Sequence, residues 1–266
     1  VNGRAQHDPS VEEKRRSVLK LIEEGGDEAS ALAKDLSKRV VEEQLRTCWK
    51  LGIYFDLLNW ESDIIRYGFL EKVTKRLMEL GIAVKEASGP NVGCIVIKVG
   101  SLPEFKALTN PDEVLIRSDG TATYVAKDIA YACWKLGWLG EDFRYGVWGE
   151  QPNGQRVWTT TYGEGVAAHP PFGDVDRAIT FVDIRQGYEQ KIVKYAAELI
   201  GVKGEKEKRE YRHFSYEVVS LSKKTAEEVS KEKLELGDRK IIHMAGRRGL
   251  VINADDVLDG LVKLVE

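Results

Sequence analysis

The segment Val114–Leu136, which reads VLIRSDGTATYVAKDIAYACWKL, constrains the fold more than any other part of the chain. It opens with a short β-branched run, which predicts a strand, and reaches Asp119–Gly120, a dipeptide that readily forms a tight turn. The hydroxyls of Thr121 and Thr123 can cap a helix, and from Tyr124 the apolar residues recur at helical spacing until a glycine follows. We therefore expect a strand, a tight turn and an amphipathic helix.

The two faces of this predicted helix differ in character. The apolar face carries Val125, Ile129, Cys133 and Leu136, and the second face carries Tyr124, Asp128, Tyr131 and Lys135. The carboxylate of Asp128 is thus one turn from the phenol of Tyr124. This pair could bind a cation, since an aspartate can accept fork-like, charge-assisted hydrogen bonds from a guanidinium. The alternative is the solvated polar face of an ordinary amphipathic helix.

The pattern RSDGT-x-TY-x-A-x-D-I-A-Y at Arg117–Tyr131 resembles the segment that opens the second half of the catalytic domain in arginyl-tRNA synthetases. In that family, the residues that match Tyr124 and Asp128 line the arginine pocket, and the aspartate faces the guanidinium. The resemblance thus implies that arginine is the cation. A nucleotidyltransferase of similar fold is a weaker reading, because this motif is particular to the arginyl family.

Residues from about Pro9 to Leu51 predict two long helices joined at Glu23–Gly26. The basic residues on their polar faces are Lys14, Arg15, Arg16, Lys34, Lys38 and Arg39. These could contact RNA phosphates, although alternating signs of charge are typical of a solvated helix. The run LGIYFDLLNWESD at Leu51–Asp63 predicts an aromatic packing junction, and it resembles an LGI-x-[FY]-D-x-x-x-x-ES run of the arginyl enzymes.

Phe69–Leu80 predicts an amphipathic helix that ends at Gly81, and Ile82–Lys85 and Gly93–Val99 are β-rich runs. By resemblance to class I synthetases, this unit is an insertion between the two halves of a Rossmann-type domain. The expected fold class is α/β, with the second half of that parallel-sheet core, a helical region and a small α+β insertion. The expected ranges are 1–66 for the helical region, 67–112 for the insertion, 113–237 for the core, and 238–266 for a signature loop and its following helix.

After position 137, Asp142–Trp148 predicts a strand, and Gly149–Gly173 predicts a polar, glycine-rich excursion with a turn at Gln151–Gly154. Two further strands are expected, at Ala178–Asp183 and at Phe214–Leu221, and a solvated charge run at Glu205–Arg212. A helix at Tyr188–Ile200, which we expect to end at Gly201, follows the first of these strands.

Gln186 lies at the carboxyl end of the predicted strand Ala178–Asp183, where ligands bind in open parallel sheets. Capping the next helix is an equally good interpretation of this residue. A resemblance to DRVI-x-V-x-D-x-RQ-x-YE-Q of archaeal-looking arginyl enzymes implies that Gln186 helps to hold the backbone end of the amino acid.

Asp238–Gly249, DRKIIHMAGRRG, is a basic, glycine-containing loop that can bring cations and backbone N–H groups to a triphosphate, or else a basic surface turn. It resembles the K-M-S-K-S signature loop of class I synthetases, in which His243, Met244, Ala245, Gly246 and Arg247 would bind ATP. The resemblance implies catalytic roles for His243, Arg247 and Arg248. His243 and Ala245 depart from the common Lys and Ser, so pyrophosphate stabilisation would fall to Arg247, Arg248 or Lys240.

The four histidines His7, His169, His213 and His243 form no H-x-G-H tetrapeptide, which supplies half of the ATP site in class I synthetases. We therefore expect an incomplete catalytic fragment of an arginine–tRNA ligase, without the anticodon-binding domain and inactive alone. The alternative is a truncated, non-catalytic relative that binds arginine or tRNA. The implied substrates and partners are arginine, ATP with Mg2+, and tRNA; no tightly bound cofactor and no metal site are expected.

The charge of the chain sets a limit on these partners. With 40 Lys and Arg against 43 Asp and Glu, the net charge is −3, so any RNA contact must be local. Cys48, Cys94 and Cys133 fit no zinc spacing and predict buried thiols in a reducing, cytoplasmic setting. No apolar run approaches the length of a membrane span, so no membrane partner is expected.

Overall fold

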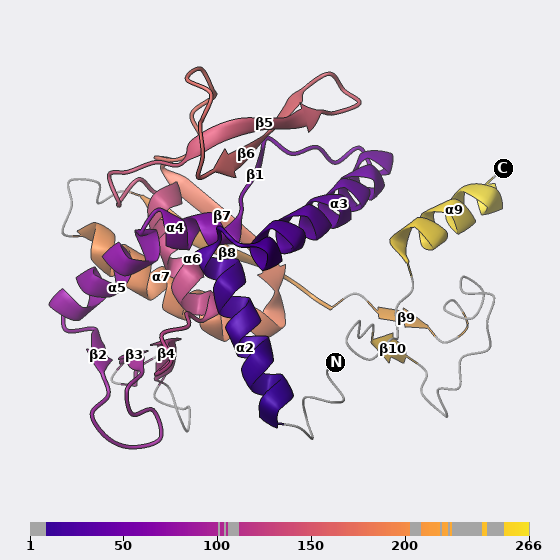
Figure 1. Cartoon of the computed structure of the whole chain (residues 1–266). Coiled ribbons are helices and arrows are strands. Elements are labelled where there is room, and N and C mark those ends of the chain that lie inside the picture. Colours follow the sequence, from indigo (N-terminus) through magenta and orange to yellow (C-terminus); the bar gives the residue numbers. More distant parts are fainter. Residues whose placement is uncertain are drawn as a thin grey trace.

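Helices and strands are mixed along the part of the chain that the computed structural model describes, and the fold is α/β (Figure 1). The described residues are 9–100, 102–103, 105, 112–202, 209–218, 220–222, 224, 241–243 and 253–265. Within these segments, no helix is long and apolar enough to cross a membrane. Cys48, Cys94 and Cys133 are free thiols; Cys133 is buried, and the other two are half-buried.

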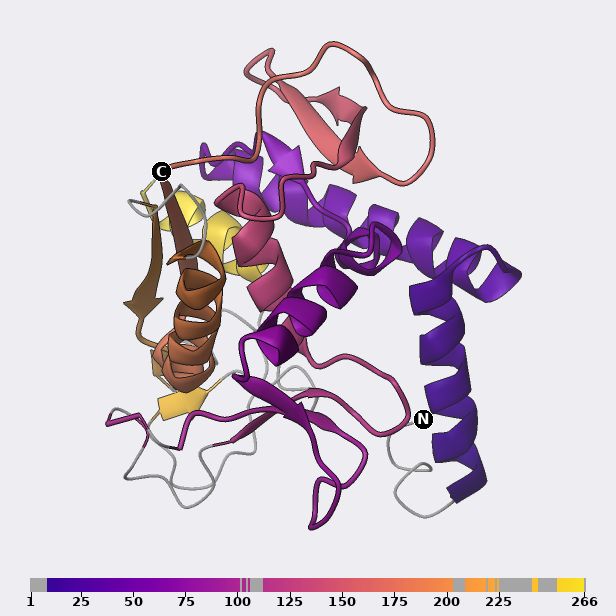
Figure 2. The same cartoon turned by 90° about the vertical axis from the view of Figure 1, so that its left-hand side faces the viewer.

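Helices α2 (Pro9–Glu24) and α3 (Glu28–Lys50) meet at a corner and run in different directions from it, like the two arms of an L (Figures 1 and 2). The turn between them is fixed by Asp27, whose carboxylate accepts a 2.7 Å hydrogen bond from the backbone N–H of Ser30 in a capping box. This arrangement confirms the two predicted helices and their junction.

Many of the basic side chains on α2 and α3 lie in ion pairs within their own helix. Arg15 and Arg16 pair with Glu12, Arg39 pairs with Asp35, and Lys38 pairs with Glu42. Pairs at these spacings are typical of a solvated helix surface. The contacts therefore favour the solvated reading of these residues over phosphate binding.

The predicted insertion forms a small α+β unit. Helix α5 (Phe69–Glu79) follows α4 (Glu61–Arg66) and precedes an antiparallel sheet of β2 (Ala83–Lys85), β3 (Ile95–Ile97) and β4 (Glu113–Ile116) in the order β2-β3-β4. The helix and both β-rich runs are therefore confirmed. Because β4 pairs with β3, the expected limit between residues 112 and 113 runs through one sheet instead of between two.

A second sheet corrects the prediction for residues 149–173. Strand β6 (Arg156–Thr161) lies within this range, pairs antiparallel with β5 (Arg144–Glu150), and is also parallel to β1 (Leu57–Leu58). The predicted turn is present, with the N–H of Gly154 donating to the carbonyl of Gln151 over 2.9 Å. Arg156–Thr161 of this range thus forms the second strand of a β-hairpin, whereas the rest after Thr161 is irregular, and the strand β1 was not predicted.

Strands β7 (Arg177–Asp183) and β8 (Glu210–Tyr216) are parallel and in continuous register, from Arg177 opposite Glu210 to Asp183 opposite Tyr216. Between them lie the 3-10 turn η1 (Ile184–Gln186) and helix α7 (Gly187–Val202), so the three elements form a β-α-β unit. Two details differ from the expectation. Helix α7 continues through Gly201 to Val202, and β8 begins inside the charge run that was expected to be a turn.

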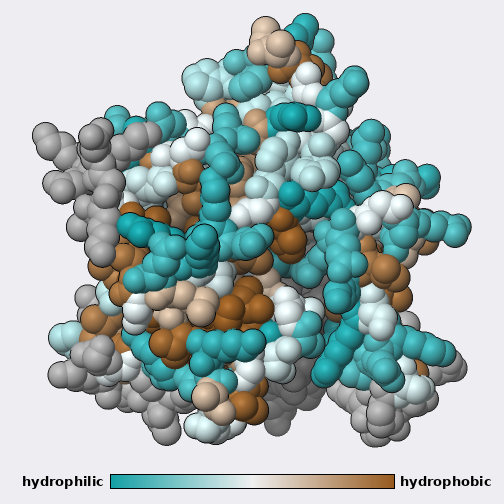
Figure 3. All heavy atoms as spheres, turned by 60° about the vertical axis from the view of Figure 1, so that its left-hand side comes forward, coloured by the Kyte–Doolittle hydropathy of each residue, from teal (hydrophilic) through white to brown (hydrophobic). Residues whose placement is uncertain are grey.

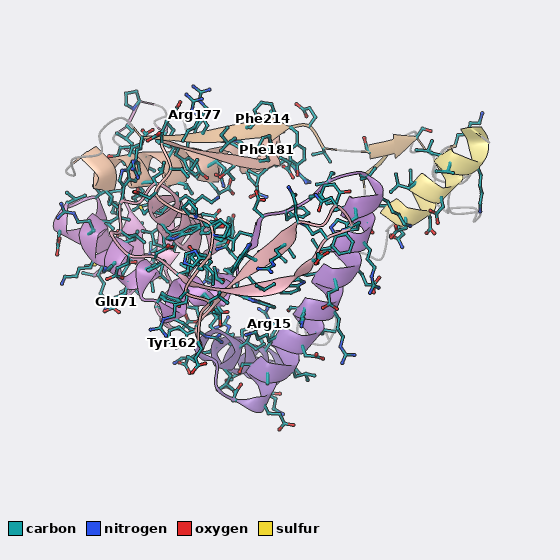
Figure 4. All side chains as sticks on the ribbon, turned by 90° about the horizontal axis from the view of Figure 1, so that it is seen from above. Arg15, Glu71, Tyr162, Arg177, Phe181 and Phe214 are labelled. Carbon is teal, nitrogen blue, oxygen red and sulfur yellow. The ribbon has the colours of Figure 1, made fainter. Side chains whose placement is uncertain are left out.

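The core lies around α6 (Tyr124–Lys135), which packs against α5 and α7. Ala178 and Tyr211, on the helix-facing side of the β7–β8 pair, are buried. On its other side, Phe181 and Phe214 are 63% and 59% exposed, with ring centroids 5.0 Å apart (Figure 4). On the face that Figure 3 shows, apolar side chains lie in separate groups among hydrophilic ones.

The last described elements are the antiparallel pair β9 (Ser220–Ser222) and β10 (Ile241–His243), and helix α9 (Ala254–Val265). The carboxylate of Asp255 in α9 accepts hydrogen bonds of 2.8 Å from Thr47 Oγ1 and from Lys50 Nζ of α3. Helix α9 is the helix that was predicted to follow the loop, and these contacts hold it against the C-terminal end of α3.

Candidate functional site

Helix α6, which carries the predicted cation-binding pair, is fixed at its start by the turn before it. The carboxylate of Asp119 accepts hydrogen bonds from the N–H and hydroxyl of Thr121, and Gly120 has φ +85°, which suits a glycine. The hydroxyl of Thr123 accepts a hydrogen bond from the N–H of Ala126 and donates one to the carbonyl of Val114. The predicted turn and cap are thus confirmed, and they join α6 to β4.

The apolar face of α6 is fully buried, as predicted: Val125, Ile129, Cys133 and Leu136 are each 0% exposed. The opposite face is only partly covered. There Tyr131 donates a 2.5 Å hydrogen bond to Asn59 Oδ1, and Lys135 Nζ lies 4.2 Å from the centroid of the Tyr131 ring. The second face is therefore a polar layer against neighbouring segments and not a fully solvated surface.

Asp128, at the middle of this face, is half-buried. Burial raises its pKa, and the charge of Glu61 acts in the same direction, whereas the hydrogen bond from Gln190 and the charge of Lys135 lower it. The hydrogen bond runs from Gln190 Nε2 to Asp128 Oδ2 over 3.4 Å. The ionised form of a partly desolvated carboxylate is costly when its hydrogen-bond donor is neutral, so a cationic group of a bound ligand would stabilise it.

Tyr124 is 54% exposed, and its phenol donates a 3.2 Å hydrogen bond to Glu189 Oε1 of α7. The other oxygen of this carboxylate, Glu189 Oε2, is buried and has no hydrogen-bond partner among the described residues. Burial and then the charge of Glu189 raise the pKa of Glu113, and burial followed by the charges of Glu189, Glu113 and Asp128 raises the pKa of Tyr124. Tyr124 therefore stands in a region of negative potential.

Gln186 is the last residue of η1 and is half-buried. Capping of this turn falls to Asp183, whose carboxylate accepts a 2.8 Å hydrogen bond from the N–H of Arg185. Gln186 precedes Glu189 and Gln190, the partners of Tyr124 and Asp128, by about one turn. The structure thus places Tyr124 and Asp128 beside the first turn of α7, and Gln186 lies in the 3-10 turn that precedes this helix.

Four residues at the junction of α6 and α7 were not predicted from the sequence: Glu113, Glu189, Gln190 and Tyr211. Gln190 is 1% exposed and accepts a 2.6 Å hydrogen bond from the hydroxyl of Tyr211 on β8. Gln190 lies at helical spacing with Val193 and Ala197 on the buried face of α7, and a glutamine in such an apolar row is unusual, which is a signal that the sequence contained. The identity of its partners depends on how α6, α7 and β8 pack.

The predicted ATP-binding loop lies almost entirely outside the described residues. His243 is the last residue of β10 and pairs with Ser220 of β9. Lys240, Met244, Ala245, Gly246, Arg247 and Arg248 lie outside the described segments. The assignments made to this loop therefore stay predictions.

A cleft of about 990 Å³ lies between α2, α4 and the turn at Asp119–Gly120. Lys127 on its wall forms ion pairs of 2.7 Å with Glu23 and 2.6 Å with Glu61. Neither Tyr124 nor Asp128 lines this cleft, although Glu113 does, so the predicted cation-binding pair lies outside it. Among the described residues, no group of three or more Asp, Glu, His or Cys side chains could hold a metal ion.

Comparisons with known proteins point to one family, although no protein-family model matches the chain. An arginine–tRNA ligase of Thermococcus sibiricus is 40% identical over 219 residues, which are 82% of this chain and 33% of that protein. The arginyl-tRNA synthetase of Thermus thermophilus has a similar structure, with a TM-score of 0.62, 30% sequence identity, and a match that covers 86% of this chain and 38% of that one. Over the matched residues, the chain belongs to the arginyl-tRNA synthetase family.

The match to arginyl-tRNA synthetases extends over almost the whole chain in another relative. An arginine–tRNA ligase of Deinococcus radiodurans is 32% identical over 253 residues, which are 95% of this chain and 37% of that protein. The resemblance first drawn from Arg117–Tyr131 is thus confirmed. The chain spans about a third of the length of these curated arginine–tRNA ligases.

Proposed function

We propose that this chain is the arginine-binding portion of an arginine–tRNA ligase, and that the α6–α7 junction is its arginine site. Two observations support the proposal. The chain belongs to the arginyl-tRNA synthetase family over the matched residues. The junction places a partly buried carboxylate, Asp128, on the same polar helix face as the exposed phenol of Tyr124.

The proposal assigns one role to each predicted site residue. Asp128 accepts two hydrogen bonds from the guanidinium of arginine, and the planar fork of the guanidinium matches the carboxylate. Tyr124 supplies a hydrogen bond or its ring face. Gln186 holds the backbone end of the amino acid from the carboxyl end of β7, the position at which ligands bind in open parallel sheets.

In the proposed architecture, the β7–α7–β8 unit belongs to the second half of a Rossmann-type core, and α5, β2 and β3 form the insertion. The parallel pairing of β7 and β8 supports this reading. Helices α2 and α3 belong to the helical region of the same catalytic domain. The ranges 1–66, 67–112, 113–237 and 238–266 stay our division of the chain, with β4 shared between two of them.

The proposed reaction has two steps. The carboxylate of arginine attacks the α-phosphorus of ATP, which releases pyrophosphate and forms arginyl-adenylate. A ribose hydroxyl at the end of the tRNA then attacks the arginyl carbonyl and displaces AMP. Little covalent chemistry is required of the protein, so its contribution is positioning and charge stabilisation. We assign the stabilisation of pyrophosphate to Arg247, Arg248 or Lys240. We also propose a cytoplasmic location for a protein with this ligase function.

The observation that carries the proposal is the desolvated carboxylate of Asp128, and an Asp128→Asn variant tests it. The change keeps the shape and removes the charge. A charge-assisted pair of this kind is worth about 2–5 kcal/mol, so arginine should bind roughly 30-fold or more weakly. Citrulline, an uncharged near-isostere, should bind poorly to both proteins, and lysine should bind less well than arginine because an ammonium cannot make a two-pronged contact.

The measurement is calorimetric titration of the three amino acids into the 266-residue chain. Asp35→Asn is the matched control, because it removes a carboxylate from an exposed ion pair on α3. Unchanged arginine binding in a folded Asp128→Asn variant would contradict the proposal. It would leave Asp128 as an ordinary residue of a helix surface.

A non-catalytic relative that only binds arginine or tRNA is the second candidate. The observation in its favour is that His243 and Ala245 stand where the signature loop commonly has Lys and Ser. Arginine binding supports both candidates, so ATP–pyrophosphate exchange, measured on a protein that contains the chain and an H-x-G-H segment, distinguishes them.

A further inference from the structure

A chain of hydrogen bonds from β8 through α7 ends at Asp128. The hydroxyl of Tyr211 donates to Gln190 Oε1 over 2.6 Å, and Gln190 Nε2 donates to Asp128 Oδ2 over 3.4 Å. Gln190 and Tyr211 are 1% and 2% exposed, so water does not compete for these bonds. Neither residue is on the same element as Asp128, and the three meet only in the folded protein.

The chain of bonds has a fixed direction. An ionised carboxylate only accepts hydrogen bonds, so the amide of Gln190 must turn its nitrogen toward Asp128 and its oxygen toward Tyr211. Burial raises the pKa of Tyr211 to about 12, so its hydroxyl is a donor at neutral pH. If the amide were reversed, Oε1 would face the carboxylate oxygen, and two acceptors would repel. The carboxylate of Asp128 therefore sets which end of the Gln190 amide faces it, and the hydroxyl of Tyr211 satisfies the amide oxygen and holds the side chain in place.

The groups around Asp128 show what this bond does to its charge. Glu61 on α4 favours the protonated form, and Lys135 on α6 favours the ionised form, both through charge. Burial, the largest effect, also favours the protonated form. Gln190 on α7 is the hydrogen-bond donor that opposes burial, and it leaves Oδ1 and a second lone pair of Oδ2 for a ligand.

We propose that Gln190, held in place by Tyr211, is a positioning residue for arginine: it keeps the Asp128 carboxylate ionised and fixed in the orientation that a guanidinium needs. This inference rests on the proposed arginine site. Neither residue touches the ligand in this scheme. Both act through Asp128, so they should affect the pH dependence of binding as well as its strength.

Tyr211→Phe is the main test, because it removes only the hydroxyl that holds the Gln190 amide in place. Gln190→Met, which keeps the length of the side chain and removes the donor, is the second variant. Loss of a hydrogen bond to a charged group lowers an affinity about tenfold or more, so Gln190→Met should bind arginine about tenfold more weakly at pH 7. Tyr211→Phe should show a smaller loss in the same direction.

The pH profile of arginine affinity separates positioning from general damage. Binding requires ionised Asp128, so affinity is present above the pKa of this group and is lost as the pH falls through it. Without the donor from Gln190, this pKa rises further. The midpoint of the profile should therefore move to higher pH in both variants, as measured by calorimetric titration from about pH 4, near the ordinary pKa of an aspartate, to about pH 8.

Tyr67→Phe is the matched control. The Tyr67 hydroxyl donates a hydrogen bond of 2.7 Å to the carbonyl of Thr161 and accepts one of 3.0 Å from the N–H of Arg144. The variant therefore removes the same atom from a hydrogen-bonded tyrosine that has no link to Asp128. This control should keep both the affinity and the pH midpoint of the unchanged chain. Circular dichroism checks that each variant folds, and Tyr211→Phe decides the outcome if Gln190→Met does not fold.

The outcomes distinguish this inference from the proposed function. If the unchanged chain and Asp128→Asn bind arginine equally, the proposed arginine site is wrong, and the inference with it. If Asp128→Asn loses affinity while Tyr211→Phe keeps both the affinity and the midpoint, the arginine site stands and the role of Gln190 and Tyr211 is overturned. A weaker affinity with a midpoint shifted to higher pH supports the inference.

Discussion

The buried ammonium of Lys127 should be a main link between α6 and the helices that precede it. Lys127 is 8% exposed and forms ion pairs with Glu23 of α2 and Glu61 of α4. Burial alone would lower its pKa, but the hydrogen bonds with Glu23 and Glu61 outweigh burial, and the pKa is raised. The charged form of Lys127 therefore stabilises the folded protein.

Lys127→Met keeps most of the aliphatic side chain and removes the charge. Breaking a buried ion pair costs about 3–5 kcal/mol when the remaining partner is buried and unpaired. Here the carboxylates of Glu23 and Glu61 are 29% and 64% exposed, so water solvates them in the variant, and the expected loss is about 1–3 kcal/mol. At about 2–4 °C per kcal/mol for a chain of this size, the Tm should fall by roughly 3–10 °C.

The assay is urea unfolding at pH 7 followed by circular dichroism, with Lys72→Met as the matched control. Lys72 pairs with Glu141 on the surface, where both side chains are about half exposed, so its loss should cost under about 1 kcal/mol. The stabilisation by Lys127 should also disappear as the pH rises through its raised pKa, since a deprotonated amine cannot form the pairs. Equal stabilities of the two variants at pH 7 would refute the reasoning.

Two further predictions concern the ATP chemistry. The 266-residue chain alone should not catalyse ATP–pyrophosphate exchange dependent on arginine and tRNA, because it contains no H-x-G-H tetrapeptide, and robust exchange by the purified chain would refute this. In a protein that carries both the chain and an H-x-G-H segment, Arg247→Ala should slow adenylate formation more than it weakens arginine binding, because its charge would act in the transition state. Single-turnover kinetics and equilibrium binding give the two quantities, and equal losses would contradict the assigned role.

The features of the site that could be predicted from the sequence are local. The turn at Asp119–Gly120, the cap at Thr123 and the apolar face of α6 each depend on residues within a few positions of one another. The residues of the polar face of α6 could therefore also be predicted from their spacing. The partial burial of Asp128 could not be predicted, because it depends on the packing of α7.

The missed strands have different causes. Strand β1 is two residues long, too short for an alternating pattern, and exists through its pairing with β6. Strand β6, RVWTTT, has β-forming residues, but the glycine-rich segments on both sides hid it. The partners Glu189, Gln190 and Tyr211 could not be predicted, because i, i+3 and i, i+4 rules say nothing of which helices and strands meet.

The parallel pairing of β7 with β8 also has a consequence for the order of folding. The whole of α7 lies between the two strands, so the chain must close a long loop before the first hydrogen bond between them can form. Such non-local contacts form late and slowly, whereas the turn and helix of Asp119–Lys135 can form early from nearby residues. Until α7 has docked, Asp128 is an ordinary solvated carboxylate, and selectivity for a guanidinium would be among the last properties that the chain acquires as it folds.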